Sequence, residues 1–206
     1  MYSLPYFKEK DESEVIRFMY AHPFITLCGC GANNEPVATQ VPVLIKQRGE
    51  QLVLEGHFMK NTDHHQAFLH NPAALAMFTG AHTYVSASWY KEKNVASTWN
   101  YISVHARGTL QFLHEESLFR ILKETTAHFE NDPNSPASYD KLPTAYIQKL
   151  SKAIVAFEIP VQQIDNVFKL SQNHHRENQV AIIENLSKQD ADAQQIAKEM
   201  GKRMGK

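Results

Sequence analysis

Aromatic side chains cluster around a charged loop in residues 84–108. Both tryptophans of the chain, Trp89 and Trp99, flank the polar residues 91–94. Aromatic side chains bring a flat apolar face and, in tyrosine and tryptophan, a hydrogen-bonding tip. Two such groups at the rims of one loop are therefore suited to form the walls of a site for a planar ligand. Core packing is the simpler interpretation of each tryptophan taken alone, because most large aromatic side chains only pack.

A candidate anion site lies in residues 56–62, which read G-H-F-M-K-N-T. A predicted strand meets a predicted helix there, and either Asn61 or Thr62 can cap the helix. Free backbone N–H groups, the helix dipole and the Lys60 ammonium together favour a phosphate. The alternative is a surface lysine before an ordinary capped helix. The sequence contains no glycine-rich phosphate loop or dinucleotide fingerprint, so a Rossmann fold has no support.

The histidines and serines do not form a recognisable metal or hydrolase pattern. His64 and His65 are adjacent in a predicted helix, where neighbouring side chains point about 100° apart and cannot easily share one ion. No His-Glu-x-x-His motif includes His57 or His70. The serines near His105 lack a G-x-S-x-G elbow. We therefore predict neither a metal site nor a serine hydrolase.

The bulk composition indicates a folded protein without a strong electrostatic field. Of its 206 residues, 43% are hydrophobic and 21% are charged, and the net charge is −1. This balance provides no general attraction for a nucleic-acid backbone. Cys28 and Cys30 are two apart, which suits reduced thiols better than a disulfide. No signal peptide and no apolar run long enough to cross a bilayer is visible, so we expect a cytoplasmic protein without a membrane span.

The hydrophobic pattern predicts many strands joined by short links, with few helices between them. Strands are expected at residues 24–30, 36–46, 51–58, 73–79, 84–88, 99–113 and 153–159. Helices are expected at residues 12–21, 63–70, 115–129 and 145–150, and from Val180 onward. Pro42 predicts an edge or a bulge in its strand. This order favours a Greek-key or split β-barrel over a doubly wound sheet. We predict one domain, residues 1–186, followed by a helical tail, residues 187–206.

The C-terminal tail combines a basic face with an apolar helical stripe. The stripe consists of Ile196, Met200 and Met204. It predicts a helix that packs on a partner surface while its lysines and arginine face solvent. A helix-turn-helix needs two packed helices, and the polar residues 187–195 lack the core for one. DNA binding therefore has no recognisable motif, although it is not excluded.

Four sequence blocks occur in order along the chain. They are M-Y-S-L-P at 1–5 with Phe7; G-H-x-x-K-N at 56–61; S-x-S-W-Y at 86–90 with T-W-N-Y-x-x-V-H at 98–105; and K-L-S-Q-N at 169–173. Together they resemble the PaiB-like family of FMN-binding proteins, often labelled negative transcriptional regulators. The chain departs from the family pattern at several positions; among them, Met59 and His174 replace arginines, and Ala87 and Ser97 replace prolines.

The resemblance implies a mainly β fold with α-helices (α+β). This fold is a split β-barrel of the pyridoxamine-oxidase/FMN-binding type, with peripheral and C-terminal helices. It also implies FMN as the cofactor and a homodimer with the flavin at the subunit interface. The implied cofactor-binding residues are Thr39, Gln40, Val41, His57, Lys60, Asn61, Thr62, Ser88, Trp89, Tyr90, Trp99, Asn100, Gln172, Asn173 and Arg176.

Within that set, the resemblance suggests different roles for different segments. Lys60, Asn61 and Thr62 would hold the phosphate, and the backbone of residues 39–41 would approach the flavin ring. The aromatic residues and Asn100 would shape the flavin side and the dimer contact, and residues 172–176 would come from the other subunit. His105 is the best candidate for a protein proton donor.

Three function classes remain open. The family label implies a transcriptional regulator or a flavin and redox sensor. The alternative is a flavin-dependent oxidoreductase or flavin reductase acting on a small molecule, in which the cofactor carries the redox chemistry. The third class is a flavin carrier or a relic barrel that no longer binds FMN.

Overall fold

The computed structural model describes residues 1–2 and 4–204 of the chain. Its strands are β1 (Phe24–Cys30), β2 (Pro36–Arg48), β3 (Gln51–Met59), β4 (Ala73–Val85), β5 (Thr98–Thr109), β6 (Gln111–Phe112) and β7 (Ile154–Lys169). Its helices are α1 (Glu12–Ala21), α2 (Asp63–His70), α3 (Glu115–Glu130), α4 (Thr144–Ser151), α5 (Arg176–Leu186) and α6 (Ala191–Met204).

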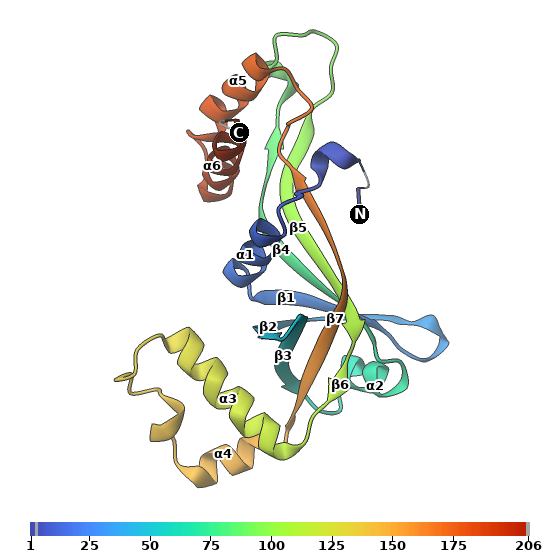
Figure 1. Ribbon diagram of the computed structural model, residues 1–206, viewed down its shortest axis with the longest axis vertical. Coiled ribbons are helices and arrows are strands. Elements are labelled where there is room, and N and C mark those ends of the chain that lie inside the picture. Colours follow the sequence, from blue (N-terminus) through green and yellow to red (C-terminus); the bar gives the residue numbers. More distant parts are fainter. Residues whose placement is uncertain (3, 205–206) are drawn as a thin grey trace. The chain divides into compact units, whose positions relative to one another are not determined.

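The strands form one seven-stranded sheet that closes on itself. Their order is β3-β2-β1-β4-β5-β7-β6, and β3 also pairs with β7 through antiparallel partners from Val53↔Pro160 to Met59↔Ile154 (Figure 1). Closure removes most exposed sheet edges, as in other barrels. The prediction of an α+β split β-barrel is confirmed.

The chain divides into two compact units. The barrel unit comprises Met19–Phe78 and His105–Ile164, and the terminal unit comprises Met1–Phe18, Thr79–Val104 and Asp165–Lys206. The strands β4, β5 and β7 each contribute residues to both units.

The core of the barrel unit is filled by large apolar side chains from its strands. Ile25, Leu27, Leu54, Phe78 and Phe157 are fully buried. Gly56 lies so close to Phe157 that a Cβ atom there would approach a ring carbon to 2.7 Å, so a glycine is needed in this part of β3. Close packing of this kind leaves little room for a larger residue.

Helix α3 contributes apolar and ionic contacts to the barrel unit. Leu118 and Ile121 of α3 pack against Ala156 of β7. Glu55 of β3 is completely buried, and its carboxylate accepts hydrogen bonds from Arg120 of α3 at 2.7 and 2.9 Å and from Arg48 of β2. A buried carboxylate persists because charged donors replace its lost hydration.

In the terminal unit, α5 and α6 pack against each other (Figure 1). Ile182 of α5 and Ile196 and Met200 of α6 are buried. The predicted apolar stripe therefore packs largely within this chain, and the expectation that it needs a partner surface is corrected. Residues 187–195 also contain a turn and the start of α6, so the expected lack of a second packed helix was wrong. Ser3 of the first sequence block and residues 205–206 of the predicted tail lie outside the described residues, and a domain boundary at residue 186 stays a prediction.

Some predicted strand limits also need correction. Residues 84–88 are not a separate strand: β4 continues to Val85, and a short 3-10 helix (Ala87–Trp89) follows, where the Ser86 hydroxyl accepts a hydrogen bond from the Ser88 N–H at 3.2 Å. Strand β2 as a whole has β1 and β3 as neighbours, but Pro42 pairs only with β1, so Pro42 lies at a local edge, as predicted. Pro42 lies where the pairing of β2 changes from β1 to β3, which is a position that tolerates the missing N–H.

Candidate functional site

The predicted phosphate residues lie at the end of β3 and the start of α2. Thr62 is the N-cap of α2, and its hydroxyl accepts a hydrogen bond from the His65 N–H at 3.3 Å. Asn61 has a positive φ of 60°, and its N–H donates to His65 Nδ1 at 3.2 Å. The His64 N–H donates to the Asp63 carboxylate at 2.7 Å. These amides of the α2 start thus have acceptors from the protein itself.

A negative charge also stands at this helix start. Hydrogen bonds from the backbone and side chain of His64 stabilise the ionised form of Asp63 and lower the pKa of that carboxyl. Such a charge is favourable beside the positive end of a helix. It also competes there with any other anion, so the helix start alone is a poor place for a phosphate.

Lys60 is exposed and lines a cavity of about 400 Å³ in the barrel unit. Lys152, which the sequence reasoning did not single out, lines the same cavity together with Ser151. The Lys60 N–H donates to the Ala153 carbonyl at 2.8 Å, which ties the two lysine-bearing segments together. No local pattern around Lys152 distinguishes it from an ordinary surface lysine.

His57 precedes this segment on β3 and carries an unsatisfied buried atom. Its Nδ1 is buried and has no hydrogen-bond partner. Burial disfavours the charged imidazolium, so the pKa of His57 is lowered. The next residue, Phe58, packs on Phe157 and Phe68 with ring centroids 5.1 and 6.3 Å apart.

The predicted flavin-ring contacts of β2 lie beside β1. Thr39, Gln40 and Val41 pair with Leu27, Thr26 and Ile25. Val41 is buried and Gln40 is exposed. Strand β3 pairs with β2 only from Val43 to Arg48, so no strand of the described residues pairs with the other edge of residues 39–41. Backbone groups on that edge can serve a ligand, as predicted for a flavin.

The aromatic residues of the terminal unit differ in exposure. Trp99 is 53% exposed and contacts Tyr84, with ring centroids 5.9 Å apart. Trp89 is half-buried in the short 3-10 helix, where Ser88 is exposed. Tyr90 is only 8% exposed, its ring lies 4.6 Å from that of His174, and its hydroxyl has no partner. Burial raises the pKa of that hydroxyl. Trp99 therefore offers an open aromatic surface, whereas Tyr90 is a buried residue with an unmet hydrogen bond.

The block at residues 169–173 packs against the aromatic block. Asn100 is fully buried, and its amide exchanges two hydrogen bonds with the Ser171 hydroxyl, at 2.9 and 3.1 Å. The Lys169 ammonium donates to the Trp99 carbonyl at 2.6 Å and to the Thr98 hydroxyl, and burial lowers the pKa of Lys169. Lys169 was not predicted as a site residue, although it begins this block. It holds the backbone of Trp99 in place.

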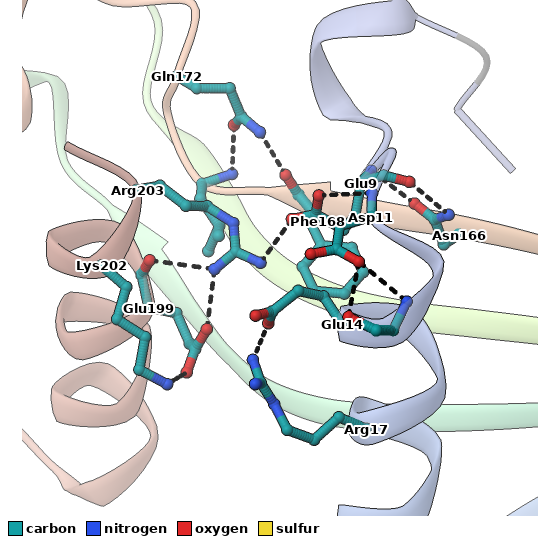
Figure 2. A network of polar contacts seen from close by, with 12 residues as sticks. Glu9, Asp11, Glu14, Arg17, Asn166, Phe168, Gln172, Glu199, Lys202 and Arg203 are labelled. Atoms are coloured by element: carbon teal, nitrogen blue, oxygen red, sulfur yellow. Dashed lines mark hydrogen bonds and ion pairs between the residues drawn. The ribbon is translucent and has the colours of Figure 1, made fainter. Parts of the chain in front are cut away.

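Gln172 closes the turn after β7. Its side chain accepts from the Leu170 N–H at 2.7 Å and donates to the Phe168 carbonyl at 2.5 Å (Figure 2). Asn173 and Arg176 are exposed. Gln172 and Arg176 line a cavity of about 290 Å³ with Arg203 of α6. Arg203 itself is held by Glu9 at 3.0 Å and Glu199 at 2.8 Å.

The predicted residues thus fall into two groups. The barrel unit holds residues 39–41, 57 and 60–62, together with His105, which is half-buried in β5. The terminal unit holds residues 88–90, 99–100, 172–173 and 176. Two residues of the second group contact the segment 171–174 that carries Gln172 and Asn173: Asn100 bonds to Ser171, and the Tyr90 ring contacts that of His174. No cluster of three or more side chains suited to a metal ion occurs in residues 1–2 and 4–204. None of the helices in this described part is long and apolar enough to span a bilayer.

Comparisons with known proteins identify the family of the chain. Residues 1–163 match the family described as "Putative FMN-binding domain". The chain is 31% identical over 207 aligned residues to the protease synthase and sporulation protein PAI 2 of Bacillus subtilis (strain 168), covering 100% of this chain and 99% of that protein.

Two solved structures show the fold at low sequence identity. One is the FAD and heme binding protein of Mycobacterium smegmatis, with a TM-score of 0.58, 15% identity, and coverage of 84% of this chain and 78% of that one. The other is the flavocytochrome Anf3 of Azotobacter vinelandii, with a TM-score of 0.55, 15% identity, and coverage of 82% and 72%. The family match and the full-length relative together show that the chain belongs to the PaiB-like family of proteins with an FMN-binding domain.

Proposed function

We propose that the protein is a cytoplasmic, homodimeric, FMN-binding regulator of the PaiB type, which senses flavin or redox state. One observation supports the assignment of particular residues to the cofactor site. Among the described residues, the buried side-chain polar atoms without a hydrogen-bond partner are His57 Nδ1 and the Tyr90 hydroxyl. Both belong to residues predicted to bind the cofactor. A buried polar atom without a partner costs about 1–3 kcal/mol, and such atoms are often completed by a ligand.

Other residues suit a flavin as well. Lys60 lines a cavity and forms no ion pair with an acidic side chain of the described residues, so its ammonium is available for a phosphate. Residues 39–41 present a strand edge that is free on one side. Trp99 offers an exposed aromatic face of the size that a flavin ring or a partner subunit would cover. Bound FMN would supply the redox chemistry, and the chain would orient it and exclude water.

The homodimer is supported by an uncharged open face of the barrel unit. On this face, none of the side chains of β1 and its cross-strand partners on β2 is charged or buried, and Phe24 is 65% exposed. These residues are Phe24, Thr26, Cys28, Cys30, Pro36, Ala38, Gln40 and Pro42. Two copies could meet through such a face without like-charge repulsion. Gln172, Asn173 and Arg176 would then reach the flavin of the other subunit.

A flavin-dependent oxidoreductase or flavin reductase is the second candidate, because the basic residues of α6 are partly neutralised. Lys202 and Arg203 form ion pairs with Glu199, and Arg203 also pairs with Glu9 (Figure 2). Neutralised cations release fewer counterions from DNA and contribute less to its binding. This arrangement favours a role that needs no direct DNA contact.

The colour of the purified protein tests the cofactor assignment. A yellow sample that releases FMN on denaturation supports both candidates. A colourless protein that cannot be loaded with FMN contradicts both. The loaded protein is then assayed for NAD(P)H oxidation and, in parallel, for a mobility shift of its own promoter DNA. A specific shift without turnover indicates the regulator, and turnover without a shift indicates the enzyme.

A further inference from the structure

The cavity beside the end of β3 has cationic side chains at its rim and an apolar floor. Lys60 and Lys152 both line it, and Leu118 and Ala156 contribute apolar surface. Its volume of about 400 Å³ lies in the range of small-molecule sites. The cavity lies within the barrel unit and is lined by Lys60 directly after β3, by the start of β7, and by residues of the helices α3 and α4 and their flanking segments. Its composition suits a ligand with an anionic group attached to a larger organic body.

The two lysines have no ionic partner of their own. Within the described residues, neither Lys60 nor Lys152 forms an ion pair with an acidic side chain. Glu115 also lines the cavity, so the lining carries one excess positive charge from two lysines and one glutamate. Two ammonium groups at one rim repel each other, and a phosphate between them would relieve that repulsion.

One residue that lines the cavity, Ala156, is paired with a residue whose buried side-chain atom lacks a partner. His57 itself does not line the cavity. Ala156 is the cross-strand partner of His57, and directly paired residues of an antiparallel sheet project from the same face. The buried Nδ1 of His57 is therefore on the sheet face from which Ala156 lines the cavity. The Ser151 hydroxyl, also at the cavity, donates to the Gln148 carbonyl at 3.1 Å and is satisfied.

At the start of α2, in contrast, the backbone N–H groups already donate hydrogen bonds to side chains of the protein. Its amides donate to His65, Asp63 and Thr62, and the Asp63 carboxylate opposes a second anion. A phosphate recognised by Lys60 is thus better accommodated on the cavity side of this lysine than on the helix amides.

We propose that Lys152 is a second cationic residue of the phosphate site and that it acts with Lys60 at the rim of this cavity. The inference rests on the proposed FMN binding and adds a residue and a location to it. Each lysine would make one charge-assisted contact, which corresponds to a loss of affinity of about ten-fold or more when it is removed.

The test compares FMN with riboflavin, which has the same ring and ribityl chain but no phosphate. Dissociation constants are measured by flavin fluorescence for the wild-type chain, Lys60→Ala, Lys152→Ala and Lys149→Ala. Lys149 provides a matched control, because it is an exposed lysine of α4 that does not line the cavity. Circular dichroism and melting curves verify that all variants are folded.

We expect Lys152→Ala to weaken FMN binding about ten-fold, to leave riboflavin binding unchanged, and to lose its effect at high salt. Lys149→Ala should bind both flavins like the wild type. If the wild type binds FMN and Lys152→Ala binds it equally well, the inference is overturned while the proposed function stands. If the wild type binds neither flavin, the proposed function fails and the inference fails with it.

Discussion

Replacing Tyr90 by phenylalanine separates the stability of the ligand-free chain from its affinity for FMN. The change removes only the hydroxyl and keeps the ring, whose contact with His174 has a centroid distance of 4.6 Å. The hydroxyl is buried and has no partner. Tyr90→Phe should therefore make the ligand-free protein more stable and, if this hydroxyl meets the flavin, make it bind FMN less tightly.

The expected size follows from the burial of the group. Burying a hydroxyl without a hydrogen-bond partner costs about 1–3 kcal/mol. Replacing tyrosine by phenylalanine removes the hydroxyl and therefore recovers that free energy. We expect a gain of about 1 kcal/mol in the free energy of unfolding and a loss of about ten-fold in FMN affinity.

Urea unfolding followed by tryptophan fluorescence measures the stability change, since Trp89 and Trp99 both lie in the terminal unit with Tyr90. Tyr84→Phe is the control: its ring is 48% exposed, so the change should stay within about 0.5 kcal/mol. A Tyr90→Phe variant that is less stable than the wild type by 1 kcal/mol or more would refute the reasoning, because the hydroxyl must then have a partner in the folded chain.

Three further predictions concern stability. Glu55→Gln should lower the free energy of unfolding by about 3 kcal/mol in urea titrations, because two arginines lose their buried counter-ion, whereas Glu124→Gln on the surface should cost less than about 1 kcal/mol. Burial lowers the pKa of His57, so the unfolded chain binds more protons than the folded chain below about pH 6.5, and the free energy of unfolding falls as the pH drops. His57→Gln should reduce the slope of that free energy against pH by up to about 1.4 kcal/mol per pH unit. Urea unfolding at several pH values measures this slope. Gly108→Ala should lower the melting temperature, because its Cβ would lie 2.3 Å from the Pro160 carbonyl oxygen, and Gly201→Ala in α6 should raise it by removing a helix-breaking residue. No change on Gly108→Ala, a pH slope unaffected by His57→Gln, or equal effects at Glu55 and Glu124 would each contradict the corresponding argument.

Local sequence signals predicted correctly the helices and strands that are followed by proline or glycine. The bounds of α1, β1 and α2 agree with the prediction to the residue, because His22-Pro23, Gly31 and Asn71-Pro72 end them. The strand predicted at residues 153–159 is too short, because β7 continues through Pro160 to Lys169. The pairing of β7 with β3 ends at Pro160, so the missing N–H removes no further bond to β3.

The sequence predicted which blocks of residues belong to the candidate site, but it did not predict the tertiary contacts between those blocks. The aromatic block and the K-L-S-Q-N block were recognised separately, and the hydrogen bonds between Asn100 and Ser171 appear only when the chain folds. Lys152 carries no local signature, because its significance comes from the cavity that it shares with Lys60. The buried, unpartnered atoms of His57 and Tyr90 are likewise a property of packing. Residue type predicts which groups can bind a ligand, and only the fold determines which of them lack a partner.

Titration of the ligand-free protein with FMN in a calorimeter tests the central claim most directly. The claim is that this chain is an FMN-binding protein whose unpartnered polar atoms and unpaired lysines serve the cofactor. It predicts saturable binding with one FMN per subunit and weaker binding of riboflavin. Absence of saturable FMN binding by the folded protein would contradict it.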